Sequence, residues 1–435
     1  MLEASFVLIA ASAALGLWLS RSPNRRRLEA WQRAVAACGL EIVEESAGWS
    51  PGLRARAGQV YARIETLGDK GRFARISIEA PAPPDFHSVT IRPQTKLEIG
   101  REIEIGDRPF DDAYFIQGPT RLVRALLDAE ARRLLIGMRD SWLTIAEGEL
   151  QALAPNQDVA GVLSRLLKAR KHFAPPIHIL QRLVDNAAND PEPGVRLRNL
   201  LLLVRELSWS PETQGALQRA CSDPVAEIRL RAAKELGAEG RGVLQELAEG
   251  LEDDAVSAEA VSLLDREMPF ERLTSILGLA MRRRRLQTAR LCVDSIGRRG
   301  APAGVGLLAK ILEREQGDLA TAAAEALGAI GSPAAEPALI QALQSDQEDL
   351  RVAAAKALGR AGTAAAVPPL KEAAEDDRLD LGLRRATRQA IAEIQSRVQG
   401  ASPGQLSLAG SEAGQLSLSS DPAGQLSIPP EERPE

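Results

Sequence analysis

The chain has 435 residues, with 54 basic and 59 acidic side chains and a formal net charge of −5. This balance excludes the large overall excess of positive charge that is typical of proteins that bind nucleic acid without sequence preference. Thirteen of the 14 aromatic residues lie before residue 211, and the rest of the chain contains one, Phe270. The composition therefore predicts a first part with an aromatic core and a second part built from small aliphatic side chains, rather than one enzyme with a single core.

Residues 1–27 contain an uncharged apolar run from Ala4 to Leu19, followed by Arg21 and three more arginines at 25–27. The run predicts a single transmembrane helix over residues 4–20, although at about 1.5 Å per residue it reaches about 24 Å, short of a bilayer core of about 30 Å. The arginines that follow predict an outward N-terminus and a cytoplasmic body at the inner or plasma membrane. A cleaved signal peptide and an ordinary buried helix are the alternatives.

Residues 28–150 predict a small α+β domain with a mainly antiparallel sheet. A helix is expected first, over 28–38, and a long amphipathic helix over 120–137. Between them, apolar and polar residues alternate as in strands at 60–64, 73–78, 86–91 and 102–105, with a hairpin turn at 68–71 and a closing strand at 141–146.

Within this domain, residues 106–115 read GDRPFDDAYF. They resemble a GDxxFDxxF signature of uncharacterised bacterial membrane-associated proteins, and that resemblance implies no established activity. Asp107 and Asp111 flank a proline turn, which Phe110 and Phe115 can anchor to the core. The alternative is a paired acid–base or cation site.

Residues 151–210 predict a helical connector or atypical first repeats, and residues 211–397 predict an α-solenoid. Apolar markers recur along this part of the chain, at Leu207, Leu236, Leu264, Ile296, Leu327, Leu358 and Ile391. Their period of about 31 residues accommodates two short helices with their turns. In the two best copies, an apolar stripe with spacing i, i+3, i+4, i+7, i+8 buries one helix face. Gly328 and Gly359 are expected to end these helices in a left-handed conformation.

Two segments, EIRLRAAKELG at 227–237 and DLRVAAAKALGRAG at 349–362, resemble HEAT-like repeats of the short bacterial type. Copies at 238–300 are expected to be degenerate, without the Asp/Arg pair. The resemblance implies helix pairs that bind proteins along a concave face lined by the second helices; a minority of such solenoids act in phycobilin attachment or bind nucleic acid. Arg351 and Lys356 are candidate partner-binding residues.

Four consecutive arginines are expected at the end of a first helix and in the turn after it. They are Arg282, Arg283, Arg284 and Arg285. Their positive charge suits the negative end of the helix dipole. The alternatives are an acidic partner, for which all four are candidate binding residues, or a phosphate backbone. No aromatic residue accompanies the run, which disfavours stacking on single-stranded nucleic acid.

Residues 398–435 predict a disordered tail, in which GQLSL, GQLSL and GQLSI follow one another at regular intervals, beginning at residues 404, 414 and 424. In an extended chain, the apolar residues of each copy lie on one side, which suits addition to a sheet edge or a shallow pocket. The candidate binding residues are Leu406, Leu408, Leu416, Leu418, Leu426 and Ile428. A duplicated low-complexity tail without a partner is the alternative. The repeated phrase also resembles the QLSL core of bacterial sliding-clamp-binding peptides, but the terminal Phe of those peptides is absent from all three copies.

These patterns predict a multi-domain, membrane-tethered, non-enzymatic scaffold that binds protein partners through the solenoid and the tail. The chain carries no nucleotide-binding or hydrolase motif, and Cys38, Cys221 and Cys292 lie too far apart in sequence for a metal motif. We therefore expect no catalytic residue, cofactor, metal or small-molecule substrate, and nucleic acid is disfavoured as a partner.

Two alternatives remain open. The first is an accessory, lyase-like enzyme with a site between the α+β domain and the solenoid, which requires a pocket with clustered carboxylates around Asp107 and Asp111. The second is nucleic-acid binding through Arg282–Arg285, which requires further basic side chains on the same face.

Overall fold

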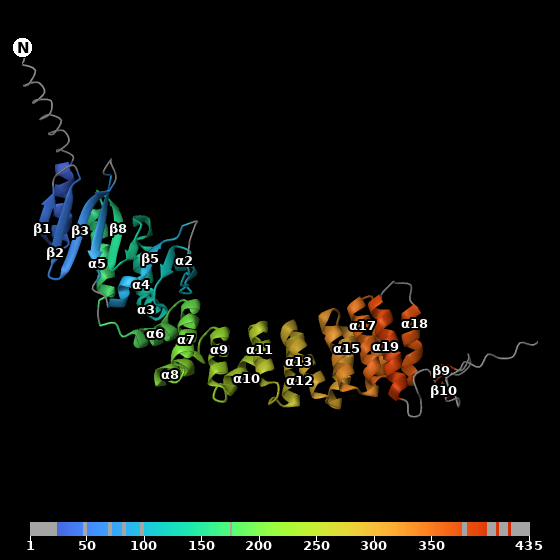
Figure 1. The fold of residues 1–435 in the computed structure, drawn as a ribbon. Coiled ribbons are helices and arrows are strands. Elements are labelled where there is room, and N and C mark those ends of the chain that lie inside the picture. Colours follow the sequence, from blue (N-terminus) through green and yellow to red (C-terminus); the bar gives the residue numbers. More distant parts are fainter. Residues whose placement is uncertain are drawn as a thin grey trace, which may run out of the picture. The chain divides into compact units, whose positions relative to one another are not determined.

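The computed structural model describes residues 24–46, 50–67, 72–80, 84–95, 100–174, 176–375, 381–397, 406–408 and 416–418. The chain divides into two compact units, Met1–Leu236 and Gly237–Glu435. The first unit contains an eight-stranded sheet and several helices, and the second contains a series of helix pairs (Figure 1).

The sheet of the first unit is antiparallel throughout, in the order β1-β2-β3-β4-β8-β7-β5-β6. Its strands are β1 (Glu41–Ser46), β2 (Gly52–Ala57), β3 (Val60–Leu67), β4 (Phe73–Glu79), β5 (Thr90–Pro93), β6 (Tyr114–Gln117), β7 (Thr144–Ala146) and β8 (Glu149–Pro155). Buried and more exposed residues alternate along β8, so one face of the sheet packs on the core. The predicted strands at 60–64 and 73–78 are found as β3 and β4, and the closing strand as β7.

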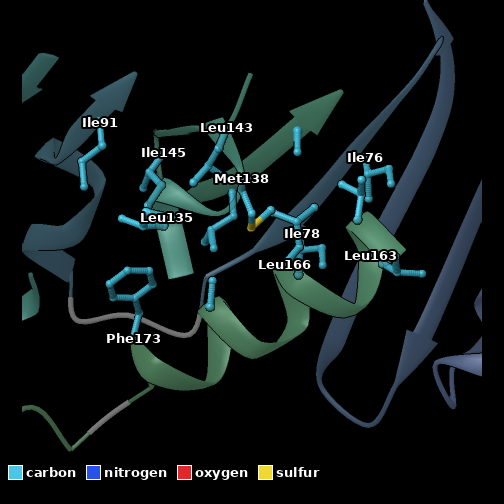
Figure 2. Close-up of a cluster of buried hydrophobic side chains, with 14 of the residues drawn as sticks. Ile76, Ile78, Ile91, Leu135, Met138, Leu143, Ile145, Leu163, Leu166 and Phe173 are labelled. Carbon is cyan, nitrogen blue, oxygen red and sulfur yellow. The ribbon is translucent and has the colours of Figure 1, made fainter. Parts of the chain in front are cut away.

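Side chains from residue 28 to residue 195 of the first unit meet in one hydrophobic core. Helix α5 (Val159–His172) packs on β4 and β8, and a helix over residues 24–37 contributes the buried Trp31. Figure 2 shows part of this core, with Ile76, Ile78, Ile91, Leu135, Met138, Leu143, Ile145, Leu163, Leu166 and Phe173. The rings of Phe86 and Phe173 lie 5.7 Å apart between centroids. The aromatic core expected from composition is therefore present here.

Three sequence expectations for this unit were wrong in detail. The strand expected over 86–91 begins only at Thr90, as β5, because residues 84–88 form a short 3-10 helix. Residues 102–105 form no strand. The Ile103 N–H donates to the Ile116 oxygen of β6 at 2.9 Å, but the Ile105 N–H donates to the side chain of Asp111, also at 2.9 Å, so the pairing with β6 does not continue. The long helix expected over 120–137 is two helices, α3 (Thr120–Leu126) and α4 (Ala129–Ile136). Asp128 begins the second of them by accepting the N–H groups of Glu130 and Ala131. The hairpin turn at 68–71 lies outside the described residues.

Two helix pairs complete the first unit: α6 (Ile179–Asn189) with α7 (Pro193–Leu207), and α8 (Pro211–Ala220) with α9 (Ala226–Leu236). Buried ion pairs join them to their neighbours. Arg132 of α4 binds Asp190 at 2.8 Å, and Arg196 of α7 binds Asp223 at 2.7 Å. Arg132 therefore links α4 to the turn of the first helix pair, and Arg196 links that pair in the same way to the turn of the second.

The described part of the second unit contains a series of helix pairs. In each pair we call the earlier helix the first helix and the later one the second helix. The first helices are α10 (Arg241–Gly250), α12 (Phe270–Arg282), α14 (Val305–Arg314), α16 (Glu336–Ala342) and α18 (Val367–Glu375). The second helices are α11 (Asp254–Leu264), α13 (Leu286–Arg299), α15 (Asp318–Ile330), α17 (Glu348–Ala361) and α19 (Leu381–Arg397). Each second helix contacts the next one along the chain, as expected for a solenoid (Figure 1).

The repeats at 238–300 were expected to be degenerate. They are joined by a carboxylate that accepts backbone N–H groups, and not by an Arg–Asp ion pair of the kind described above. The carboxylate of Asp254 at the start of α11 accepts the N–H of Gln287 at 3.0 Å and that of Thr288 at 2.9 Å, at the start of α13. Burial opposes ionisation of Asp254, but these N–H groups and the Thr288 hydroxyl outweigh it and hold the pKa of this carboxyl below its usual range. One second helix therefore caps the next.

The predicted membrane anchor is corrected. Within the described ranges, no helix is long and apolar enough to cross a membrane. Residues 4–20, on which the prediction rested, lie outside those ranges. The apolar run also reaches only about 24 Å at about 1.5 Å per residue, less than a bilayer core. The fold class is therefore an antiparallel sheet domain and a helical solenoid, and we withdraw the transmembrane helix and the single-pass localisation at the inner or plasma membrane.

Candidate functional site: a groove on the second helices

The second helices α13, α15 and α17 approach one another closely because a glycine faces an alanine at each contact. A Cβ added to Gly297 would lie 2.8 Å from the Cα of Ala326, and one added to Gly328 would lie 2.7 Å from the Cα of Ala357. Real Cβ atoms do not come this close to a neighbouring backbone. Glycine is therefore required at these positions for the observed spacing of the helices.

This finding corrects the role expected for Gly328 and Gly359. Both lie inside helices, since α15 continues to Ile330 and α17 to Ala361. The left-handed residue after α15 is Gly331, with a φ of 69°. Gly359 also faces an alanine, with a Cβ position 3.0 Å from the Cα of Ala390 on α19.

A groove of about 510 Å³ lies across α13, α15 and α17. Its floor is made of glycine and alanine, and its rim of charged side chains. It is lined by Arg290, Asp294, Gly297, Arg298, Glu325, Ala326, Ala329, Ala353, Lys356, Ala357 and Arg360. The close helix contacts therefore create a shallow apolar floor, and the longer rim residues surround it.

The charged rim residues of α13 are already paired within the protein. Arg290 lies 3.8 Å from Asp294, one turn along the same helix, and Arg298 binds Asp265 of the preceding repeat at 2.8 Å. Burial raises the pKa of Asp294, and the nearby Glu325 acts in the same direction, against Arg290 and Arg298. The α13 side of the groove is therefore close to neutral.

The α17 side of the groove is different. Lys356 and Arg360 are exposed, lie one helical turn apart, and form no ion pair with the described residues. On α15, between the two sides, Glu325 is the charged rim residue. The groove thus presents two cations on α17 and one carboxylate on α15, and none of the three forms an ion pair with the described residues.

Lys356, a predicted partner-binding residue, therefore lies in the groove, but Arg351 does not. Arg351 is buried, and its guanidinium donates to the backbone oxygen of Ser345 at 3.0 Å. This is the bond that Arg229 makes to the Asp223 oxygen at 2.8 Å in an earlier repeat. Arg351 therefore holds the turn before its own helix.

The arginine run, predicted as a candidate partner-binding site, divides between two roles. Arg283 donates to the Gly250 oxygen at 2.7 Å, and Arg285 donates to the Glu252 oxygen at 3.0 Å. These carbonyls lie at or just after the C-terminal end of α10, where helical carbonyls lack partners within the helix. Arg282 and Arg284 are exposed, and Arg284 lies 3.9 Å from Glu315. Arg283 and Arg285 therefore hydrogen-bond to the preceding repeat, and Arg284 makes a longer, exposed contact with the following one.

The predicted tail site is described in part. Leu406–Leu408 (β9) and Leu416–Leu418 (β10) pair as a two-stranded antiparallel sheet, with Leu406 opposite Leu418. The third copy, with Leu426 and Ile428, lies outside the described residues. The extended form predicted for the first two copies is present, and their binding role stays a prediction.

The carboxylates of the GDxxFDxxF segment are both engaged in structural bonds. Asp107 begins the short helix α2 (Arg108–Asp111) and accepts a hydrogen bond from Arg132 at 2.7 Å. Asp111 accepts the N–H groups of Ile105 and Gly106, each at 2.9 Å. Burial raises the pKa of Asp111, and these two N–H groups oppose the rise. The two carboxylates therefore support the turn, as in the first of the two interpretations given above, in which the segment is a proline turn anchored to the core.

Comparison with known proteins identifies the repeats. Residues 277–352 and 305–392 match the family model of HEAT repeats. Residues 277–392 carry HEAT repeats. The groove residues lie within this matched region, from Arg290 to Arg360.

Two solved structures are similar to parts of the chain. A structure of human deoxyhypusine hydroxylase in complex with glycerol has 17% identity over 50% of this chain and 96% of that chain, with a TM-score of 0.23. The crystal structure of an engineered protein has 20% identity over 53% of this chain and 91% of that chain, with a TM-score of 0.21. No curated protein matches the sequence.

Of the residues that line the groove, sequence reasoning named only Lys356 as a binding candidate. Among those that it missed are Arg298, Ala329 and Arg360. They are separated by one repeat period each, so they occupy one equivalent position in three successive second helices. Comparing equivalent positions across the repeats, rather than within one repeat, would have found them.

Proposed function

We propose that the chain is a non-enzymatic interaction protein that binds a protein partner in the groove on α13, α15 and α17. The HEAT repeats support this proposal, because such repeats generally mediate protein–protein interaction. The observation that carries it is the groove itself, whose apolar floor is rimmed by charged side chains. Three of them, Glu325, Lys356 and Arg360, form no ion pair with the described residues.

Both the floor and the rim of the groove contribute to the binding of a partner. The glycine and alanine floor lets a partner's backbone or a small side chain approach closely, which brings many atoms into van der Waals contact. The rim charges then favour partners whose charges are complementary and disfavour the others. The proposal that the chain is not an enzyme is supported by Asp107 and Asp111, whose oxygens are bound by Arg132 and by backbone N–H groups.

Affinity capture with a blocked groove tests this function. Ala329→Trp places a large side chain over the floor at an exposed position, and Lys310→Trp places the same side chain on the exposed surface of first helix α14. The tagged wild-type chain and Lys310→Trp should capture the same proteins from a lysate of the cells that naturally contain this protein. Ala329→Trp should not capture them. Capture of the same proteins by all three chains would show that binding does not use the groove.

A further inference from the structure

The groove has a directional pattern of charge. Asp294, Glu325 and Lys356 are separated by one repeat period each and occupy one equivalent position on α13, α15 and α17. The first two are acidic and the third is basic. The pattern therefore changes sign between α15 and α17, which a partner of uniform charge cannot match.

The equivalent position one turn further along each helix has a different pattern. Here Arg298 and Arg360 are separated by Ala329, whose side chain is exposed on the floor. A carboxylate lying over Ala329 would therefore lie between Arg360, which is unpaired among the described residues, and Arg298, which is bound to Asp265. The small methyl group of Ala329 leaves space for it. Lys356 lies one turn before Arg360 and adds a further positive charge.

The existing ion pairs decide which of these charges an occupant can use. Arg298 already binds Asp265, and Arg290 already lies beside Asp294. Lys356 and Arg360 form no ion pair with the described part of the chain. A carboxylate that reaches α17 therefore gains a Coulombic interaction without breaking an existing pair.

We propose that the occupant of this groove is an acidic segment of a partner protein, with carboxylates over Ala329 and against Lys356 and Arg360. This inference rests on the proposed function and specifies the chemistry of the partner. A peptide fits better than nucleic acid, because a peptide can place a polar or basic side chain over Glu325. A continuous phosphate backbone would instead meet the carboxylates of Glu325 and Asp294.

Peptide binding to the full chain tests the proposal. The probes are two fluorescein-labelled synthetic peptides of equal length, each with a charged half and an uncharged half of alternating Gln and Ala. The charged half alternates Glu with Ala in one (the Glu–Ala peptide) and Lys with Ala in the other (the Lys–Ala peptide), and the readout is fluorescence anisotropy. The Glu–Ala peptide should bind and the Lys–Ala peptide should not. Added KCl should weaken the binding, because exposed ion pairs are screened by salt.

Matched charge reversals locate the binding. The double variant Lys356→Glu/Arg360→Glu should weaken binding of the Glu–Ala peptide about tenfold. The control Lys310→Glu/Arg314→Glu makes the same change of net charge on the exposed face of α14 and should bind as wild type does. Ala329→Glu, which puts a carboxylate of the chain itself over the floor, should also weaken binding. Far-UV circular dichroism confirms that all variants are folded.

Three results would overturn the proposal: equal binding by the two double variants, equal binding of both peptides, or tighter groove-dependent binding of a single-stranded oligonucleotide. Failure of the acidic peptide is separable from failure of the proposed function. If the peptide does not bind but Ala329→Trp still abolishes capture of a partner, the groove binds a partner of different chemistry. If neither effect is seen, the proposed function is also wrong.

Discussion

Gly328 on α15 packs so closely against Ala357 on α17 that a Cβ on the glycine would lie 2.7 Å from the alanine Cα. The missing side chain therefore sets the spacing of the two helices. Gly297 and Ala326 make the same contact between α13 and α15, so the floor of the groove is fixed by backbone packing.

Replacing Gly328 by alanine should destabilise the protein even though alanine favours helices. Alanine in the middle of a helix gains roughly 0.5–1 kcal/mol over glycine, but overpacking against the α17 backbone costs about 1–3 kcal/mol. Gly278→Ala is the control, since its Cβ would meet only an Arg282 nitrogen at 3.7 Å, and it should stabilise. Urea unfolding followed by circular dichroism measures both, and stabilisation by both would contradict the packing account.

Removing the guanidinium of Arg132 should be strongly destabilising. Arg132 binds Asp107 at 2.7 Å and Asp190 at 2.8 Å, and its side chain is 3% exposed. Breaking a buried pair by removing one partner costs about 3–5 kcal/mol, because the remaining carboxylates stay buried without a counter-charge. Differential scanning calorimetry of Arg132→Ala should show this loss. The exposed Arg133→Ala should change stability by less than about 0.5 kcal/mol, and comparable losses in both variants would argue against the network.

The arginine run should separate into structural and dispensable members. Arg283→Ala removes the bond to the Gly250 oxygen and should cost about 0.5–1.5 kcal/mol. Arg284→Ala removes a side chain that is 79% exposed and should have almost no effect. Chemical denaturation measures both. A larger effect at Arg284 would show that the run is organised differently.

Acid should weaken the contact that Asp254 makes to α13. Because the folded-state pKa of this carboxyl is depressed, its contribution to stability is present above the unfolded pKa, about 3.9. The contribution is lost as pH falls through the lower folded pKa. Asp254→Asn should therefore cost about 1 kcal/mol near neutral pH. The difference from wild type should shrink below about pH 4, and a constant difference in unfolding free energy across this range would refute the assignment.

Much of the solenoid was predictable because its information is local and repeated. The regular period predicted the helix pairs that are observed, together with the apolar stripes of the two best copies, which begin at Leu319 and at Leu350. The role of Gly328 was not predictable from its own repeat, since a glycine near a helix end suits both a left-handed cap and a close contact. Only the position of Ala357 on the next helix distinguishes the two.

The first unit shows the same limit. The strands at 60–64 and 73–78 follow from alternation alone, but residues 102–105 alternate as well and form no strand. In that segment the Ile103 N–H donates to the Ile116 oxygen of β6, but the Ile105 N–H donates to the side chain of Asp111, which interrupts the pairing. The candidate groove was predicted only at Lys356, because its other rim residues are brought together by three successive repeats.

The most direct test of the central claim is photo-crosslinking from inside the groove. A benzoylphenylalanine at position 329 lies on the groove floor, and one at position 310 lies on the exposed face of α14. The chain is irradiated in the cells that naturally contain it. Mass spectrometry should then identify a protein that is crosslinked to position 329 and is not crosslinked to position 310. The same partners at both positions, or none at 329, would contradict a protein-binding groove on the second helices.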